Sequence, residues 1–391
     1  MPPTYSTTDF LKTAVSVAEN FGFQSIDKLS KHQICKDCTI SLPHTASAKD
    51  RRKDNLHGML ANGAVTYCEA QLHAFGTPLF SYNIESVPRS NDTAITFHIY
   101  NVPKSVAEAV LIQSLRSLVS ELGYTRHCVR INSIGDTDST GRFHRELTAF
   151  LRKRIEYLPP TARELMKEHP HLSLLDLIEK DHELGYKAPN SLEFLSDTSR
   201  KHFREIIEYL DMSDAAYEID NRLLGHHECY SDALFALDVL DEDHTPLPDL
   251  HIHGGRYDTF MRKHVREPAS AVGAVVVLRS KPIPTRLPRA KRLTPKVYLV
   301  QLGFGPKVQS LMLVDELRKA GIVVEQQLSS DSLSEQLRDA EQKETPYTVI
   351  MGQKEFVEGT VILRDMKARN QETIPKDQLV RRLKSRNAVV V

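Results

Sequence analysis

The sequence predicts an α+β protein of two or three domains, in which a larger mixed region precedes a small α/β domain. Three observations lead to this prediction. Strand-like and helix-like segments are mixed before residue 281, a proline-rich basic segment follows, and strand and helix then alternate to the end. The predicted divisions are a core over 1–281, a linker over 282–296 and a final domain over 297–391.

Apolar spacing and turn residues locate the elements of the core. Gly22 and Gly123 each follow a segment with helical spacing, so each is expected to end a helix. Prolines in "EYLPPTAREL" are expected to break one helix and start the next. The expected helices are 7–23, 105–124 and most of 142–210, and the expected strands are 93–102, 127–136 and 270–280.

Alternation of strand and helix after residue 296 predicts a compact α/β domain. The expected strands are 296–303, 322–328, 347–352 and 359–366, and the expected helices are 308–321, 332–343 and 376–386. Between core and domain, the 15 residues "KPIPTRLPRAKRLTP" hold four of the chain's 20 prolines. This density of proline predicts a linker.

Composition limits the classes of protein that fit. The chain has 391 residues, 40% of them hydrophobic and 26% charged, which is typical of a globular protein. No apolar run approaches the roughly 20 residues that a membrane helix needs, and the N-terminal residues do not resemble a secretion signal. Five cysteines do not form a disulfide framework, so a cytoplasmic location is expected. Cys35 and Cys38 form a lone CxxC pair without a second pair, which favours incidental thiols over a metal site.

Positive charge is concentrated near the linker. Residues 281–391 carry 20 basic and 13 acidic residues, although the whole chain has 51 of each. A basic cluster of this size can bind a phosphate backbone, and it can also be a solvated linker. The candidate RNA-binding residues are Arg286, Arg289, Lys291 and Arg292.

Five blocks in the same order resemble the histidyl-tRNA synthetase family over nearly the whole chain. They are "INSIGDTDS", "EFLSDTSRKHFREIIEYLDMSDAAYEID", "GGRYD", "LRKAGIVVEQQLS" and "IMGQKEFVEGTVILRDMKARNQETIP". The resemblance implies a class II synthetase core, which is an antiparallel sheet flanked by helices and commonly a homodimer. It also implies a helical insertion near 155–205 and an anticodon-binding domain at the C-terminus.

The family's catalytic arginines are poorly represented. These enzymes activate a carboxylate with ATP and Mg²⁺, and their arginines stabilise charge on the reacting phosphate. Arg89 matches the first arginine of motif 2, but the following loop is shortened. Gly225 in "RLLGHHECYSDALFA" stands where the catalytic arginine belongs, and Ser280 in "GAVVVLRSK" takes the arginine position of motif 3, where Val277 also replaces a glycine.

Scaffold residues of the ATP and histidine pocket remain. By resemblance they are Arg89, Tyr230, Gly254, Gly255, Arg256, Tyr257 and Asp258. One interpretation of GGRYD is that Tyr257 and Asp258 still bind an amino acid or a nucleotide edge. The other is a structural turn in which the glycines take positive φ and Arg256 pairs internally with a carboxylate. His226 and His227 are expected to be solvated or satisfied rather than metal ligands, and no catalytic residue is assigned.

The sequence therefore predicts a synthetase-like protein without aminoacylation activity that binds tRNA, another RNA or a partner protein. The alternative is an active, divergent histidine–tRNA ligase that uses ATP and Mg²⁺. The near-complete architecture and Arg89 favour the alternative, whereas Gly225 and Ser280 disfavour it.

Overall fold

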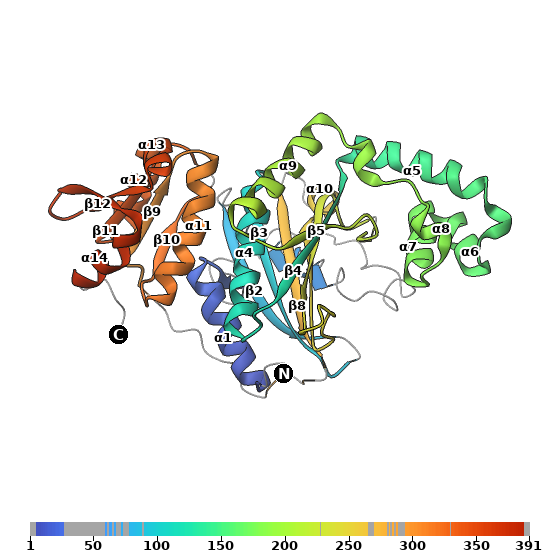
Figure 1. The fold of residues 1–391 in the computed structure, drawn as a ribbon, viewed down its shortest axis with the longest axis horizontal. Coiled ribbons are helices and arrows are strands. Elements are labelled where there is room, and N and C mark those ends of the chain that lie inside the picture. The colour runs from blue at the N-terminus through green and yellow to red at the C-terminus, as the bar shows by residue number, and fades with distance from the viewer. Residues whose placement is uncertain are drawn as a thin grey trace, which may run out of the picture.

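The computed structural model describes residues 5–26, 59–60, 62–64, 66–67, 72, 78–87, 90–226, 228–264, 270–279, 281, 284, 287, 294–328 and 330–386. Two sheets organise these residues (Figure 1). The larger has the strand order β1-β2-β3-β8-β7-β6-β4-β5, and the smaller has the order β10-β9-β11-β12-β13. The α+β class predicted from the sequence is confirmed.

The larger sheet is mostly antiparallel. Only its outer pairs β1–β2 and β4–β5 are parallel among the described strands. Every residue of β3 and β8, which lie near the middle, is buried. The strands are β1 (Gln24–Ser25), β2 (Leu79–Ser86), β3 (Thr93–Tyr100), β4 (His127–Gly135), β5 (Tyr217–Ile219), β6 (Asp232–Val239), β7 (Leu250–Arg256) and β8 (Ala271–Leu278).

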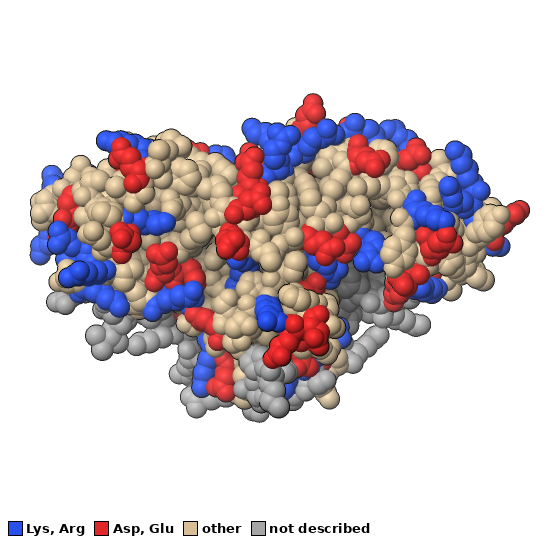
Figure 2. Space-filling model, in the orientation of Figure 1, with Lys and Arg blue, Asp and Glu red and all other residues tan. Residues whose placement is uncertain are grey.

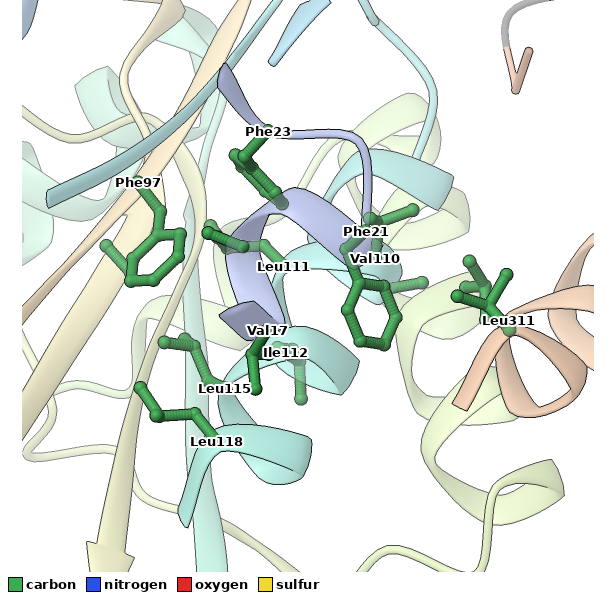
Figure 3. Packing of buried hydrophobic residues seen from close by; sticks show 14 of the residues in the cluster. Val17, Phe21, Phe23, Phe97, Val110, Leu111, Ile112, Leu115, Leu118 and Leu311 are labelled. Atoms are coloured by element: carbon green, nitrogen blue, oxygen red, sulfur yellow. The ribbon is translucent and has the colours of Figure 1, made fainter. Parts of the chain in front are cut away.

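Three helices cover one face of this sheet, namely α1 (Thr7–Asn20), α4 (Val106–Glu121) and α9 (Asp197–Met212) (Figure 1). Helix α4 lies between α1, α9 and the sheet, and it is buried around most of its circumference. Figure 3 shows the resulting core, in which Val17, Phe97 and Leu115 come from three different elements. Apolar burial of this extent is the main force that holds the layers together.

A group of helices projects from the sheet between β4 and β5 (Figure 1). Pro160 and Pro170 occupy first-turn positions, where their missing N–H groups cost no helical hydrogen bond. The helices are α5 (Thr137–Arg152), α6 (Pro160–Glu168), α7 (Pro170–Glu179) and α8 (Glu183–Tyr186). They lie in the segment expected to be helical.

The smaller sheet joins parallel strands β10, β9 and β11 to antiparallel β12 and β13. Its strands are β9 (Val297–Gln301), β10 (Val324–Gln326), β11 (Tyr347–Met351), β12 (Thr360–Asp365) and β13 (Gln371–Pro375). Its helices are α11 (Phe304–Lys319), α12 (Leu333–Gln342), α13 (Gln353–Glu358) and α14 (Leu379–Ser385). The sequence patterns did not predict the short elements α13 and β13.

Helix α11 attaches this second unit to α4 of the first (Figure 1). Leu311 of α11 is fully buried and points toward Val110 and Phe21 (Figure 3). The hydroxyl of Ser117 donates to the Asp315 carboxylate at 2.8 Å, so a polar contact accompanies the apolar one.

Glycine correctly marks several helix ends, because Gly22, Gly123 and Gly321 all have positive φ directly after a helix. The exact domain boundaries stay predictions. Among the described residues, no helix is both long and apolar enough to cross a membrane.

Candidate functional site

The GGRYD segment lies at the end of a strand, and the prediction of a turn with positive φ is wrong for Gly254 and Gly255. Both belong to β7, and neither has positive φ. A Cβ at Gly254 would lie 2.6 Å from the carbonyl oxygen of Gly273, and one at Gly255 would lie 2.9 Å from that of Ala233. Glycine is needed here because neighbouring strands approach closely, rather than because the chain turns.

Arg256 is buried and fully engaged within the protein. Its Nε and Nη2 donate to the two carboxylate oxygens of Glu108 on α4, at 2.7 and 2.6 Å. Other N–H groups point at the carbonyl oxygens of Val102 and Lys104, each at 3.3 Å, and at Asp258. A guanidinium has five N–H donors, so these contacts account for its hydrogen-bonding capacity. The predicted internal pairing of Arg256 with a carboxylate is confirmed.

Glu108 receives a second partner from α9. His202 Nε2 lies 2.8 Å from Glu108 Oε1. Burial by itself would raise the pKa of Glu108, but Arg256 and His202 outweigh it and hold that pKa at about 2. Burial likewise opposes the charged form of His202, yet Glu108 raises the pKa of this imidazole. Arg256, Glu108 and His202 therefore form a charged cluster that links β7, α4 and α9.

The hydroxyl of Tyr257 also faces inward. It lies 2.7 Å from His98 Nδ1 of β3, and both side chains are completely buried. Burial lowers the pKa of His98 to about 3, so this imidazole is neutral near pH 7. His98 stacks on Tyr100, which stacks on Tyr67 with ring centroids 4.0 Å apart. Asp258 begins α10 (Asp258–His264), and its Oδ1 accepts the Ala271 N–H at 2.7 Å.

In the loop before β6, the ring of Tyr230 packs against Gly225. The side chain of Tyr230 is buried, and a Cβ added at Gly225 would collide with its ring. The Gly225 carbonyl oxygen accepts a hydrogen bond from His171 Nε2 of α7 at 2.8 Å. An arginine side chain at 225 could not leave the backbone in this direction, because the tyrosine ring occupies the space.

Strand β8, which corresponds to motif 3 by the resemblance, is apolar. Val277 is buried in β8 opposite Ala94 and His251. Arg279 follows the strand as an exposed residue, and its backbone N–H donates to the Asp249 carbonyl at 2.9 Å.

Gly225 and Gly255 thus both lie against the ring of Tyr230. Tyr257 contacts His98 of β3, a strand of the larger sheet. Arg89, Ser280, His227, Cys35 and Cys38 lie outside the described residues, as do the RNA-binding candidates Arg286, Arg289, Lys291 and Arg292. Within the described ranges, no cluster of three or more His, Cys, Asp or Glu side chains is placed to hold a metal ion.

Sequence reasoning missed the partners that occupy this region. Glu108, His98 and His171 all touch the predicted site residues or their loop. One signal for Glu108 was available, since it is an acidic residue within the apolar run "SVAEAVLIQSL". An ionised side chain on a buried helix needs a partner of opposite charge. Nothing in the chain order identified that partner as Arg256, 148 residues away.

Comparison with known proteins gives the relatives of this chain. Residues 296–386 match the anticodon binding domain family. The histidine–tRNA ligase of Desulforamulus reducens is 26% identical over 322 residues, which cover 81% of this chain and 71% of the relative. That of Pelodictyon phaeoclathratiforme is 29% identical over 288 residues, covering 72% and 66%. That of Thermotoga maritima is 25% identical over 328 residues, covering 82% and 76%.

The solved structure of apo S. aureus histidyl-tRNA synthetase aligns with 82% of this chain and 81% of its own. The identity is 17% and the TM-score is 0.46. A mostly antiparallel sheet flanked by helices and joined to an anticodon-binding domain defines a class II synthetase architecture. Taken with the sequence relatives, it supports the histidyl-tRNA synthetase family as the family of this chain.

Proposed function

We propose that this protein is a family member that no longer forms histidyl-adenylate and that acts by binding RNA, with tRNA as the first candidate. The observation that carries the proposal is the packing of Tyr230 against Gly225. It puts an aromatic ring where the resemblance calls for a catalytic arginine.

The energetic argument concerns charge in the transition state. Attack of a carboxylate on the α-phosphate of ATP spreads negative charge over phosphate oxygens, and preorganised cations lower that barrier. Loss of one such donor costs about 10²–10³ in rate. Arg256 is not a substitute, because its N–H groups are directed at Glu108, Asp258 and two carbonyls. Loss of two arginines would reduce adenylation by roughly 10⁴ or more.

The RNA-binding part of the proposal rests on the linker and the C-terminal domain. Residues 296–386 match an anticodon-binding domain, and six basic residues occur between 281 and 296 without an acidic residue. Basic side chains bind phosphates by electrostatics without reading the sequence. The proposed organisation is a cytoplasmic homodimer with a core over 1–281, a helical insertion near 155–205, a linker over 282–296 and an RNA-binding domain over 297–391.

Histidine-dependent exchange of pyrophosphate into ATP, in the presence of Mg²⁺, tests the catalytic part on the purified full chain. We expect no exchange above the background without protein. Exchange that depends on histidine would support the alternative, an active histidine–tRNA ligase, and would refute the inactive assignment.

Binding of labelled tRNA at several salt concentrations tests the second part. We expect salt-sensitive binding that weakens when Arg289, Lys291 and Arg292 are all changed to Glu. If tRNA does not bind, the RNA proposal is wrong, and affinity capture then tests for a protein partner instead.

A further inference from the structure

Two helices outside the former catalytic region begin at one polar junction. The Ser196 hydroxyl donates to Asp136 Oδ2 at 2.7 Å, and the Asp136 N–H donates to the Ser199 hydroxyl at 3.0 Å. Asp136 caps α5 and Ser196 caps α9, so the two N-termini are fixed to each other. From this junction the helices diverge along one edge of the molecule (Figure 1).

Both helices carry cations on the side opposite their buried face. In α9 the apolar face includes Phe203, Ile206 and Leu210, and in α5 it includes Phe143, Leu147 and Leu151. The helical period of 3.6 residues places the basic side chains away from these faces. We call this set the basic ridge, and its members are Arg142, Arg145 and Arg152 of α5 with Arg200, Lys201 and Arg204 of α9.

The ridge is available to a ligand. All of its members except the half-buried Arg142 are exposed. Within the described part of the chain, only Arg142 makes an ion pair, with Asp138 at 3.2 Å. Figure 2 shows blue side chains, with red acidic ones among them, along the upper edge over the region where α9 and α5 begin in Figure 1.

Local contacts account for Arg200, whose Nη2 donates to the Leu195 carbonyl oxygen at 3.3 Å, but not for Lys201 and Arg204. Arg200 and Lys201 lie at the end of the first turn of a helix that begins at Asp197, and Arg204 lies about one turn further on. The N-terminal end of a helix carries partial positive charge, which disfavours cations there. No acidic side chain pairs with these cations within the described residues, even though the exposed Asp197 and Glu208 belong to the same helix. Lys201 and Arg204 therefore remain available to an external anion.

The form of the ridge identifies the anion. Arg142 and Arg152 lie ten residues apart on one helix, which is about 15 Å. A row of cations along two diverging helices fits an extended polyanion better than one small phosphate. Guanidinium groups match phosphate oxygens in geometry and keep their charge at any physiological pH. Contacts of this kind position a nucleic acid without selecting its sequence.

We propose that the basic ridge binds the sugar-phosphate backbone of RNA and forms a second contact surface beside the anticodon-binding domain. This inference rests on the proposed RNA-binding function. It differs from that proposal because it assigns contacts to α5 and α9, on the core rather than on the linker.

The test compares three variants of the full chain with the parent. The ridge variant carries Arg145→Gln, Lys201→Gln and Arg204→Gln, and the linker variant carries Arg289→Gln, Lys291→Gln and Arg292→Gln. The control variant carries Lys12→Gln, Lys167→Gln and Lys187→Gln, which removes the same charge from exposed lysines paired with Asp9, Glu164 and Glu183. Fluorescence anisotropy of labelled tRNA from 50 to 300 mM salt gives affinity and its salt dependence.

We expect the ridge variant to bind tRNA roughly 10- to 100-fold more weakly than the parent at low salt. Its slope of log affinity against log salt should fall by about 2 to 3, since each lost phosphate contact contributes about 0.7–0.9. The control variant should behave as the parent. If the ridge variant keeps the parental affinity and slope, the ridge inference is wrong. If only the linker variant loses affinity for tRNA, the ridge inference is wrong but the broader proposal of RNA binding still holds.

Hydrogen exchange on the parent provides a second measurement that needs no substitution. Added tRNA should slow exchange in 137–152 and 197–212 relative to α6 and α8. Absence of tRNA binding by the parent would overturn both proposals together, and unchanged exchange over both helices despite binding would overturn the ridge alone.

Discussion

Arg256 and Arg204 belong to the same residue type, but the protein uses them in opposite ways. Arg256 is 1% exposed and directs its N–H groups at a carboxylate pair and two carbonyls. Arg204 is exposed and makes no ion pair within the described residues. A cation whose donors are already satisfied holds a fold together, and a cation without partners is free to bind something else. Residue type alone therefore does not distinguish the buried, paired arginine of this protein from its exposed, unpaired one.

The strongest way to break this comparison is to remove the buried cation. Arg256→Ala should destabilise the protein by about 3–5 kcal/mol, because it leaves Glu108 buried without its main counter-charge. Urea unfolding measures this loss. As a matched control, Arg204→Ala should change the free energy of unfolding by no more than about 0.5 kcal/mol. Equal effects of the two substitutions would contradict the distinction.

Lowering the pH should destabilise the fold through titratable groups in the same buried region. Burial lowers the pKa of His98 and of His171 to about 3, whereas an unfolded histidine has a pKa near 6.5. Between these values the unfolded chain binds more protons, so stability falls as pH decreases, by about 1.4 kcal/mol per pH unit for each imidazole. Glu108 adds to the loss as pH falls from about 4.5 toward 2.

His202 has the opposite sign, because its pKa is raised in the folded state. The stability it contributes is present below pH 6.5 and is lost as pH rises through the folded pKa. Unfolding free energies measured from pH 4.5 to 8.5 should therefore pass through a maximum near neutrality. The His202→Gln variant should lose the decline on the alkaline side, and a decline that persists in it would have another origin.

The close contact between strands at Gly254 predicts a smaller change in stability. Gly254→Ala should cost about 1–3 kcal/mol, because the new Cβ would lie 2.6 Å from a backbone oxygen that cannot move aside. Gly141 in α5 has no atom within 4 Å of an added Cβ. Gly141→Ala should therefore stabilise the helix by about 0.5–1 kcal/mol. Thermal unfolding of the two variants separates close packing from backbone flexibility.

The ridge should give the smallest change in stability. Arg200→Gln and Lys201→Gln remove cations from the positive end of α9, and together they should stabilise the fold by less than about 1 kcal/mol. Urea unfolding at low salt is the measurement. A loss of stability would contradict this expectation and would show that the hydrogen bond from Arg200 to the Leu195 carbonyl oxygen outweighs the repulsion.

Much of the architecture followed from local patterns. Helix ends at Gly22, Gly123 and Gly321, the central strand around Phe97 and the alternation after residue 296 all depend on spacing and turn chemistry within about 20 residues. The order of the five motif blocks indicates the family from the sequence alone. Gly225 stands where the resemblance leads us to expect a catalytic arginine.

Tertiary structure alone decided which side chains contact the predicted site residues. Whether Arg256 would face a ligand or a carboxylate depended on Glu108, which lies on a helix remote in sequence. The space beside Gly225 is occupied by Tyr230 because the loop folds back on itself and is held by His171. The junction between α5 and α9 likewise joins residues about 60 positions apart. Spacing along the sequence shows which residues are neighbours on one element. Which buried charges pair, and which surface charges lie in a row, depends on which elements pack together.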